Sequence, residues 1–365
     1  MNRRSDLDVL RIVLCASVIL QHAILIYAAE PRYHVKAATV SAGATAVYEV
    51  LRIFAMPPFF AIAGWAAVAS LRRRSAAQFL RERAVRLGIP LLVGIFLFGP
   101  AIKYLELREG RDMGLAGFRL VEPIQTGFLD FLPRYYTRSV LVTWSHLWFV
   151  AYLLLYSIGL LPLLRRIAAR PMSQCVPSPA WVYLPAAPLA AVLALFHGYW
   201  PYLPNLVDDW TNFAYFALCF LAGGIIAAWP GFETRLRAQA PGLILLAAIG
   251  YTGVLTFGES MIGRLAVGLA AWGCIGGAWA LAGMWEPRPA PWLTRAAEAT
   301  LPVYVVHHLP LLWIAVWMTG TGLPVAVQVA LIAGIDTLLA VALYVWLIRP
   351  WAVPRVLFGL PPRRA

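Results

Sequence analysis

Charged residues are scarce in this chain of 365 residues: only 13% are Asp, Glu, Lys or Arg, whereas 61% are hydrophobic. Lysine is scarcer still, because Lys36 and Lys103 are the only two, so the formal net charge of +13 comes from arginine. So little charge excludes ordinary soluble domains and indicates a polytopic membrane protein in a lipid bilayer. The arginines lie in short clusters between apolar runs, a pattern that favours membrane topology signals over nucleic-acid binding.

Cysteine is also rare, and the four cysteines, at positions 15, 175, 219 and 274, show no paired or metal-ligand spacing. We therefore expect free thiols rather than disulfides. The six histidines are scattered along the sequence, from which we expect no metal site and no permanently bound cofactor. The chain shows no long-period repeat and no soluble stretch, so a single membrane domain over residues 1–365 is expected.

Apolar runs of about 20 residues recur along the chain, and each predicts a membrane-spanning helix. They lie at 7–27, 48–71, 87–104, 141–164, 181–196, 212–229, 241–257, 262–284, 301–318 and 323–348. The expected fold is therefore all-α, with about ten transmembrane helices in one bundle. Pro57 and Pro58 lie in the middle of the second run and predict a kink or break there. For the mixed stretch at 105–139 we expect an ordered external loop with a short helix.

The distribution of arginine predicts the orientation. An even number of spans places both termini on one side of the membrane. Arginine gathers in the connections that would lie on that same side, at 72–86, 165–170, 235–237 and 288–295. The connections at 198–211 and 318–322 contain no arginine. By the positive-inside rule, we expect a multi-pass protein of the cell inner membrane with both termini in the cytoplasm.

The first apolar run carries ionisable residues at Asp8, Arg11 and His22. Arg11 and His22 are eleven residues apart, which returns to nearly the same helix face about 16 Å further along the axis. Ionisable groups at that depth are costly and often functional, and imidazole transfers protons near neutral pH. Two interpretations of His22 stay open: a proton-transfer residue, or a tolerated hydrogen bond between helices.

Arg83 and Arg86 lie at i, i+3 immediately before the third run, so both are expected on one side of a helix. Guanidinium groups suit bidentate phosphate recognition. The alternative is that these two arginines act only as a topology signal.

Other polar residues are weaker candidates. Asp336 lies near the centre of the tenth run, where an acid usually faces the bundle interior and pairs, here with His307 or an arginine. His146 begins the fourth run, and a helix-end role is expected for it. Glu259, Asp209 and Trp200, on the external side, could contact a sugar, although solvated loop acids and an interfacial aromatic belt are the commoner explanations.

Five motifs occur in an order that resembles a known family. They are LDVLR with Arg11 and then His22, MPPFFAIAG, RERAVR with Arg83 and Arg86, HLWFVAYLLLY, and LPVYVVHHLPLL with His307. Together they span nearly the whole chain. In them the chain resembles the acyltransferase-3 family of membrane O-acyltransferases, and most of all its branch that modifies periplasmic glucans with groups such as succinyl (glucan biosynthesis protein C). The usual Ser before Gly in the second motif is Ala63 here.

The resemblance implies transfer of an acyl group from cytoplasmic acyl-CoA, a co-substrate, to a hydroxyl of a cell-envelope carbohydrate. Arg11, Arg83 and Arg86 would bind the anionic nucleotide end, and His307 would position the donor. His22 would deprotonate the acceptor hydroxyl or accept the acyl group itself, and the sequence does not choose between these roles. Three residues are expected to support this site: Asp8, Asp336 and His146.

Two other functions remain as alternatives. A transporter of polysaccharides or lipid-linked sugars would share the many spans, but such proteins commonly show repeat symmetry, which is not seen here. Within enzymes, the acceptor could instead be an amino sugar, a peptide or an antibiotic.

Overall fold

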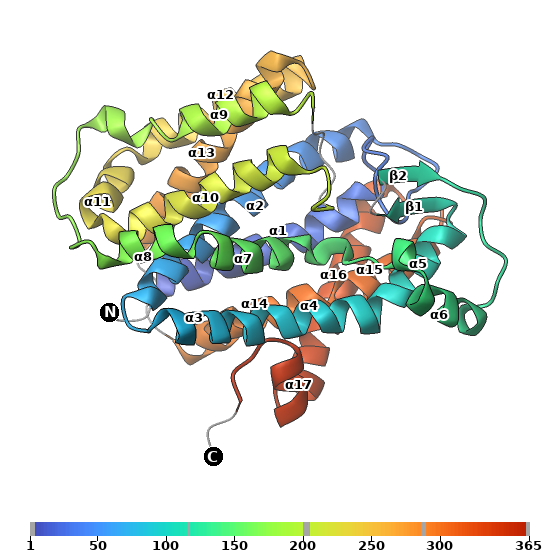
Figure 1. Ribbon diagram of the computed structural model, residues 1–365. Helices are drawn as coiled ribbons and strands as arrows, with labels where there is room; N and C mark the ends of the chain where they lie inside the picture. Colours follow the sequence, from blue (N-terminus) through green and yellow to red (C-terminus); the bar gives the residue numbers. More distant parts are fainter. Residues whose placement is uncertain (1–3, 115–116, 200–204, 286–289, 363–365) are drawn as a thin grey trace. The chain divides into compact units, whose positions relative to one another are not determined.

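The computed structural model describes residues 4–114, 117–199, 205–285 and 290–362, and this part of the chain is almost entirely helical (Figure 1). Its contacts divide the chain into two compact units, each built from three separate stretches. The first unit is Met1–Cys15, Glu49–Arg83 and Tyr152–Ala297. The second is Ala16–Tyr48, Ala84–Ala151 and Glu298–Ala365.

The apolar helices confirm the expected class, a multi-pass all-α membrane protein. Seven helices of the described part are long and apolar enough to span a bilayer: α1 (Ser5–Leu25), α2 (Ala42–Leu71), Ala76–Arg108, α10 (Trp210–Ala228), α12 (Ala240–Phe257), α13 (Met261–Trp285) and Val325–Ile348. Two bent pairs raise the number to nine if each pair is one span: the stretch Ser145–Gly159, which ends with α7 (Trp148–Gly159), pairs with α8 (Leu161–Ala169), and α14 (Pro291–Val306) pairs with α15 (His308–Met318).

The predicted number of ten needs a correction at the fifth apolar run. Its helix, α9 (Ala186–Phe196), has 11 residues. At a rise of 1.5 Å per residue it is about 16 Å long, too short to cross a hydrocarbon core of about 30 Å alone.

Of the kink or break predicted at Pro57 and Pro58, the break is wrong, because α2 continues through both prolines, and the kink stays a prediction. Close backbone packing within the first unit accompanies this continuity. A Cβ atom on Gly64 would lie 1.7 Å from the Phe220 carbonyl oxygen, and one on Gly223 would lie 1.7 Å from the Ala61 carbonyl oxygen. Only glycine allows α2 and α10 to approach so closely, as in other membrane helix pairs. Neighbouring elements of this kind are what allow proline inside membrane helices.

The remainder of the first unit is built in the same way. The helices α9, α12 and α13 lie side by side in Figure 1, and α11 (Pro230–Ala238) connects α10 to α12. A Cβ atom on Gly250 of α12 would lie 2.4 Å from the Ala270 amide nitrogen of α13. Large aromatic side chains fill the interior between α2 and α10, where the Phe60 and Phe216 ring centroids are 4.6 Å apart. All four cysteines are free, as expected.

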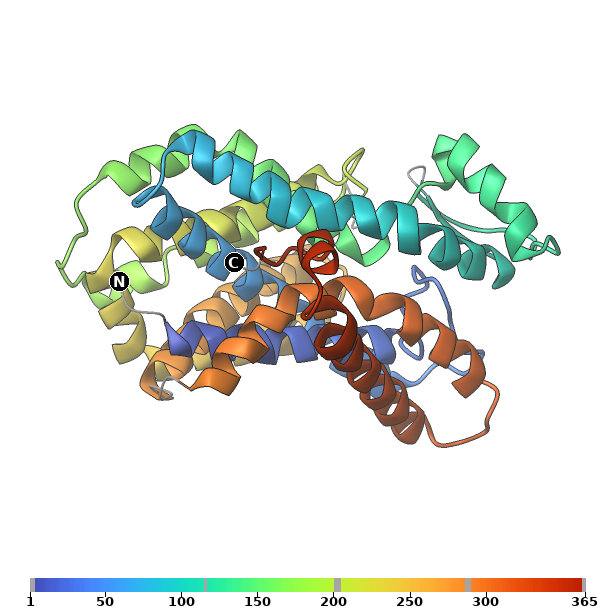
Figure 2. The same cartoon turned by 90° about the horizontal axis from the view of Figure 1, so that it is seen from below.

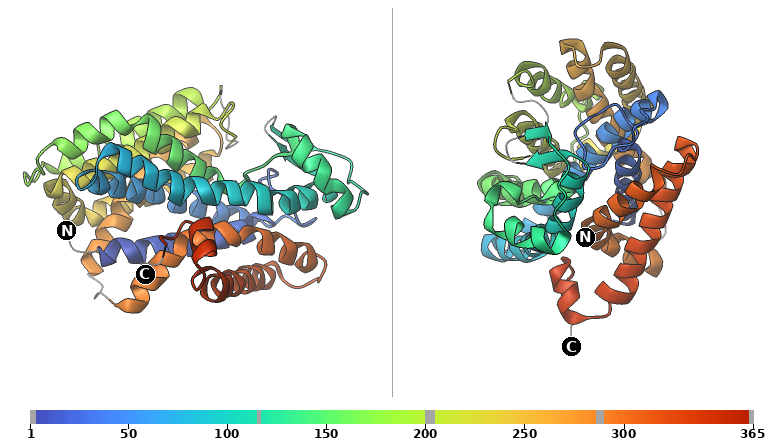
Figure 3. Two further views of the ribbon diagram at one scale, coloured as in Figure 1. Left: turned by 60° about the horizontal axis from the view of Figure 1, so that its bottom comes forward. Right: turned by 90° about the vertical axis from the view of Figure 1, so that its right-hand side faces the viewer.

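The second unit contains the C-terminal end of α1 and the loop that follows it. Lys36 fixes this turn by donating hydrogen bonds of 2.5 Å to the carbonyl oxygens of Leu25 and Ala28, at the end of α1. Tyr27 donates a 2.6 Å hydrogen bond to Gln328 of α16 (Val325–Ala342). Figures 2 and 3 show α15 and α16 running side by side and the short C-terminal α17 (Ala352–Leu357) beyond them.

The stretch at 105–139 contains the expected short helix, α6 (Phe128–Thr137), and a hairpin that was not expected. Strands β1 (Arg111–Gly114) and β2 (Gly117–Leu120) pair with Asp112 opposite Arg119. These strands have four residues each, too few for an alternating pattern to stand out in the sequence. The hairpin and α6 lie beside the end of α5 (Gly99–Arg108) in Figure 2.

Candidate active site

Five of the six histidines converge in the second unit. They are His22 in α1, His34 in the following loop, His146 before α7, and His307 and His308 at the break between α14 and α15. The His22 ring centroid is 4.7 Å from that of His308 and 5.3 Å from that of His307. The histidines are scattered in the sequence but not in three dimensions, because distant sequence positions meet here, and the expected absence of a metal site stays a prediction.

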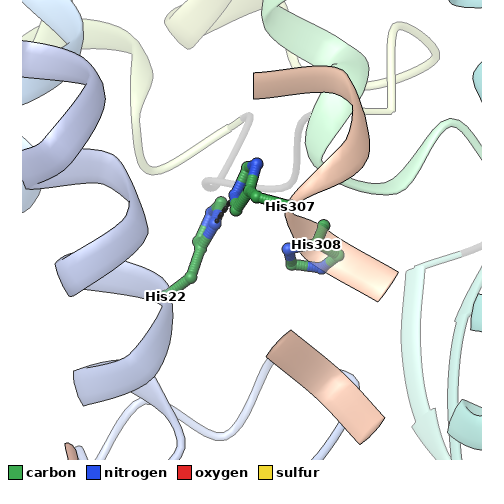
Figure 4. A group of neighbouring side chains, drawn as sticks. All are labelled: His22, His307 and His308. Carbon is green, nitrogen blue, oxygen red and sulfur yellow. Dashed lines mark hydrogen bonds between the residues drawn. The ribbon is translucent and has the colours of Figure 1, made fainter. Parts of the chain in front are cut away.

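The break that carries His307 and His308 has a local cause. Pro310 has no amide hydrogen for the Val306 carbonyl oxygen, and its ring would clash with that carbonyl in a continuous helix. Accordingly, α14 ends at Val306, α15 begins at His308, and their axes differ by 59°. His22 reaches toward this break from α1, as Figure 4 shows.

The hydrogen bonds at the break determine which ring nitrogens carry protons. The Tyr304 carbonyl oxygen lies 2.8 Å from His307 Nδ1 and 2.9 Å from His146 Nε2. A carbonyl oxygen only accepts, so both nitrogens are protonated donors. In the neutral His307 ring, Nε2 is then an acceptor, and it lies 3.1 Å from His22 Nδ1 (Figure 4). His22 Nδ1 must donate to it, which leaves His22 Nε2 unprotonated.

Several buried polar atoms beside these rings make no hydrogen bond. Among the described residues, these include His146 Nδ1, both ring nitrogens of His308 and the Tyr33 hydroxyl oxygen. The ring centroid of His308 lies 5.8 Å from that of Tyr33 and 4.5 Å from that of His146. A buried polar atom without a partner costs about 1–3 kcal/mol, so their concentration in one place marks a site for a polar ligand.

Asp336 does not form the pair expected from its position in the sequence. Its side chain is fully buried, yet neither oxygen has a hydrogen-bond partner. His307, one expected partner, is instead engaged by Tyr304 and His22.

His146 begins the fourth apolar run, as predicted, but it is also a member of the cluster. Its ring lies 4.5 Å from that of His308, nearly parallel to it. The helix-end interpretation alone is therefore insufficient.

The predicted donor-side residues have the following contacts. Arg11 forms an ion pair of 3.3 Å with Asp8, one helical turn earlier in α1. The Arg83 guanidinium lies over the Phe79 ring, 5.1 Å from its centroid. Arg86 lies in a π-helical turn (Ala84–Gly88) of the second unit and donates a long hydrogen bond, 3.4 Å, to the Gly359 carbonyl oxygen.

The predicted external residues differ from one another. Asp209 is buried and accepts hydrogen bonds from Tyr152 and Asn212, so it is not the solvated loop acid that its position suggested. Glu259 is largely exposed, and a hydrogen bond from His197 lowers the pKa of its carboxyl to about 2. Trp200 lies outside the described residues.

The cluster also contains residues that sequence reasoning missed, chiefly His34, Tyr33 and Ser145. The His34 ring lies 5.2 Å from that of His308 and its Nε2 is 2.9 Å from Ser145 Oγ. Ser145 directly precedes the HLWF motif, which is the one signal that could have drawn attention to it. No spacing rule connects residues more than 100 positions apart.

The arrangement can do two things chemically. A neutral imidazole with one bonded and one free nitrogen is a general base. The nitrogens of His22, His307 and His308 also lie within 4.8 Å of one another and could hold a metal ion. Each nitrogen that bound such an ion would need a free lone pair, so metal binding would compete with proton transfer at these rings.

Comparison with known protein families gives one match. A family model described as an acyltransferase domain matches residues 4–349. Comparisons with curated proteins and with solved structures found no significant match.

Proposed function

Because the chain belongs to the acyltransferase-3 family, we propose that it moves an acyl group from cytoplasmic acyl-CoA to a hydroxyl of a cell-envelope carbohydrate, with His22 as general base. The observation that carries the proposal is the 3.1 Å contact between His22 Nδ1 and His307 Nε2. It holds the imidazole in the tautomer whose Nε2 can accept a proton.

The proton transfer would proceed at His22 Nε2. As the acceptor hydroxyl attacks the thioester carbonyl carbon, its proton passes to this nitrogen, the C–S bond breaks, and the thiolate leaves as the protonated thiol. A positioned general base typically contributes about 10²–10⁴-fold in rate. His307 is a positioning residue in this scheme, since its Nε2 accepts the hydrogen bond that orients His22.

The donor side would be formed by Arg11, Arg83 and Arg86. Their guanidinium groups suit the phosphates of a nucleotide, which are recognised by charge-assisted hydrogen bonds. Arg11 and His22 lie on one helix, α1, eleven positions apart, which is about 16 Å of helical rise. The thin pantetheine arm of acyl-CoA can cover that distance, so its thioester would reach His22 from an anchor near Arg11.

The protein is proposed to lie in the cell inner membrane with both termini in the cytoplasm. This orientation rests on the arginine-rich connections at one end of the spans. Because the motifs most resemble the glucan-modifying branch of the family, a periplasmic glucan is the first acceptor to test and succinyl is the first acyl group to test. Amino sugars, peptides and antibiotics are the acceptors to test next.

The decisive experiment uses the purified full-length protein in nanodiscs with radiolabelled succinyl-CoA or acetyl-CoA and a glucan acceptor. Wild type should release CoA and transfer the label, whereas His22→Ala and His22→Gln should abolish transfer. His197→Ala is the matched control, because His197 belongs to the first unit and pairs with Glu259 outside the cluster.

Each outcome has a clear meaning. Near-normal turnover by His22→Gln would disprove the role of His22. A protein that moves sugar across the bilayer without consuming the thioester would be a transporter. Mass spectrometry of envelope glycans from cells with and without the gene would then identify the acceptor and the acyl group by their mass difference.

A further inference from the structure

A second group of chemically active side chains lies at the edge of the histidine cluster, entirely within the second unit. Ser145 Oγ is 2.9 Å from His34 Nε2, and His34 Nδ1 is 2.5 Å from Glu106 Oε2. Serine, histidine and an acid in this order, each within hydrogen-bond distance of the next, form the arrangement by which a serine hydroxyl is activated for attack on an acyl group.

The proton positions in this group follow from the surroundings of Glu106. Its side chain is fully buried, and its Oε1 accepts hydrogen bonds of 2.5 Å from Lys103 Nζ and from the Met113 amide nitrogen. Two donors, one of them cationic, keep the carboxyl group ionised. Glu106 therefore accepts the proton on His34 Nδ1. In a neutral His34 ring, Nε2 then has a lone pair, which accepts the hydrogen bond from the Ser145 hydroxyl.

The backbone at Ser145 is unusual. Its φ of +45° lies in the left-handed region, where a residue with a side chain is strained by about 1–3 kcal/mol. The amide nitrogen of Ser145 donates a 3.0 Å hydrogen bond to Thr143 Oγ1, which holds this conformation. Glycine would adopt it without strain, so a serine here requires a reason other than the turn itself. Strained turns also carry the nucleophile in other serine acyl-transfer sites.

The surroundings provide donors for the oxyanion that attack on a carbonyl would create. Tyr33 and His308 are buried, and the Tyr33 hydroxyl and both His308 ring nitrogens make no hydrogen bond. The ring of His34 lies 5.5 Å from that of Tyr33 and 5.2 Å from that of His308. The Tyr33 hydroxyl and the protonated nitrogen of His308 are thus unused donors next to the base of the serine, His34, and donors of this kind stabilise a developing oxyanion.

We propose that Ser145 is a nucleophile that carries the acyl group as an ester between donor and acceptor, with His34 as its base and Glu106 orienting His34. This inference rests on the proposed function and deepens it, since it replaces direct transfer by two steps. His22 then serves the second step. The His22 and His308 rings are 4.7 Å apart, so His22 borders the same cluster from the other side.

In the first step, Ser145 Oγ attacks the thioester carbonyl carbon and its proton passes to His34 Nε2. The C–S bond breaks, the thiolate takes that proton, and CoA leaves as the thiol. In the second step, the acceptor hydroxyl gives its proton to His22 Nε2 and attacks the ester carbonyl carbon. The bond between that carbon and Oγ breaks, and Oγ takes the proton from the His22 imidazolium. Ser145, His34 and His22 are then all back in their initial protonation states.

The location of the three residues fits a step on the acceptor side. His34 follows α1, Glu106 lies near the C-terminal end of the helix Ala76–Arg108, and Ser145 precedes α7. In the proposed orientation these are the external ends of three spans. The acyl group would therefore pass from the arm of the donor to Ser145 where an envelope carbohydrate can reach it.

The test is to trap the ester. Purified full-length protein in nanodiscs is mixed with acyl-CoA without acceptor, quenched in acid and analysed by peptide mass spectrometry. We expect the mass of one acyl group on the peptide containing Ser145, a burst of CoA release equal to the enzyme concentration, and neither in Ser145→Ala. With acceptor present, Ser145→Ala should lower turnover by at least about 100-fold. Ser139→Ala, at an exposed serine six residues away, is the matched control.

A second measurement does not depend on acyl-CoA. A fluorophosphonate probe should label Ser145 in wild type and in His22→Gln, and labelling should fall by at least about tenfold in His34→Gln. Ser145→Cys should retain a covalent intermediate, now a thioester that neutral hydroxylamine cleaves.

The outcomes separate this inference from the proposed function. Transfer at the wild-type rate by folded Ser145→Ala, with His22→Ala inactive, would overturn the serine step and leave the role of His22 intact. An acyl group trapped on His22 instead of Ser145 would also overturn it. Failure of the probe to label Ser145 would overturn it whether or not the protein consumes acyl-CoA, and absence of any transfer by wild type would reject the proposed function itself.

Discussion

His22 Nδ1 lies 3.1 Å from His307 Nε2, with the two rings nearly parallel, although 285 positions separate the residues in the chain. The contact links the first helix to the break between α14 and α15. It also completes a directed sequence of hydrogen bonds, from His22 to His307 and from His307 to the Tyr304 carbonyl oxygen. The family motif suggests that His307 positions the donor, which stays a prediction, and the proposed mechanism adds the role of orienting His22.

Replacement of His307 distinguishes the two roles. His307→Ala removes the acceptor for His22 Nδ1–H, so the imidazole loses its tautomer and orientation, and kcat should fall by about 10²-fold with little change in the KM for acyl-CoA. His307→Gln should recover part of the rate, because its amide oxygen can accept the same hydrogen bond. A rise in KM at unchanged kcat would instead support donor binding.

The donor-side arginines should affect binding more than chemistry. Arg86→Ala and Arg83→Ala are expected to raise the KM for acyl-CoA by about tenfold each, since a lost charge-assisted hydrogen bond is worth about 1.5–3 kcal/mol. Arg86→Lys should recover only part of the affinity because it cannot bind a phosphate bidentately. Arg74→Ala is the control, as Arg74 forms a half-exposed ion pair with Glu82. An equal effect at Arg74 would indicate a general charge effect instead.

Zinc should inhibit the enzyme. Nitrogens of His22, His307 and His308 lie close enough to hold a metal ion, and imidazole is a good Zn²⁺ ligand. Bound Zn²⁺ would occupy the lone pairs that proton transfer requires. We expect reversible inhibition by micromolar Zn²⁺ that EDTA relieves, and weaker inhibition in His308→Ala. If EDTA alone abolished activity and Zn²⁺ restored it, the ion would be a required part of the site.

The buried ion pairs behind His34 should dominate the stability of the second unit. Lys103 is fully buried and pairs with Glu106 and with Asp112, at 2.5 Å and 2.8 Å. Lys103→Met leaves two buried carboxylates without their cation, which should lower the free energy of unfolding by about 3–5 kcal/mol. Arg119→Met removes a surface partner of Asp112 and should cost less than about 1 kcal/mol. Thermal unfolding in detergent measures both, and equal losses would contradict the distinction.

The ammonium group of Lys36 should make the stability of the folded protein vary with pH in the alkaline range. Burial lowers the pKa of its ammonium group from 10.5 to about 8. Because the folded protein releases this proton at lower pH than the unfolded chain, the destabilisation is complete below pH 8 and is relieved as pH rises toward 10.5. The stability of wild type relative to Lys36→Met should therefore increase between pH 8 and 10.5. A constant difference over this range, measured by thermal unfolding, would show that the ammonium pKa is not lowered by folding.

The local properties of this chain can be derived from its sequence. Apolar runs and arginine clusters specify a multi-pass helical membrane protein, because hydrocarbon tolerates few charges and no unpaired backbone. The eleven-residue interval from Arg11 to His22 follows from the pitch of one helix, and α1 is continuous over it. The motifs were also sufficient to identify the family. These features depend on residues close together in the chain.

Only the tertiary structure decided which helix faces meet. Helical periodicity tells which side of a helix is polar but contains no information about its partner, so the meeting of His22 with His307, and of Ser145 with His34, could not be derived. Burial could not be derived either, because Asp209 lies in a polar stretch of the sequence yet is buried. The continuity of α2 through Pro57 and Pro58 likewise could not be derived. Contacts between distant residues depend on how whole helices pack, and that packing brings the acid, serine and histidines of the site together.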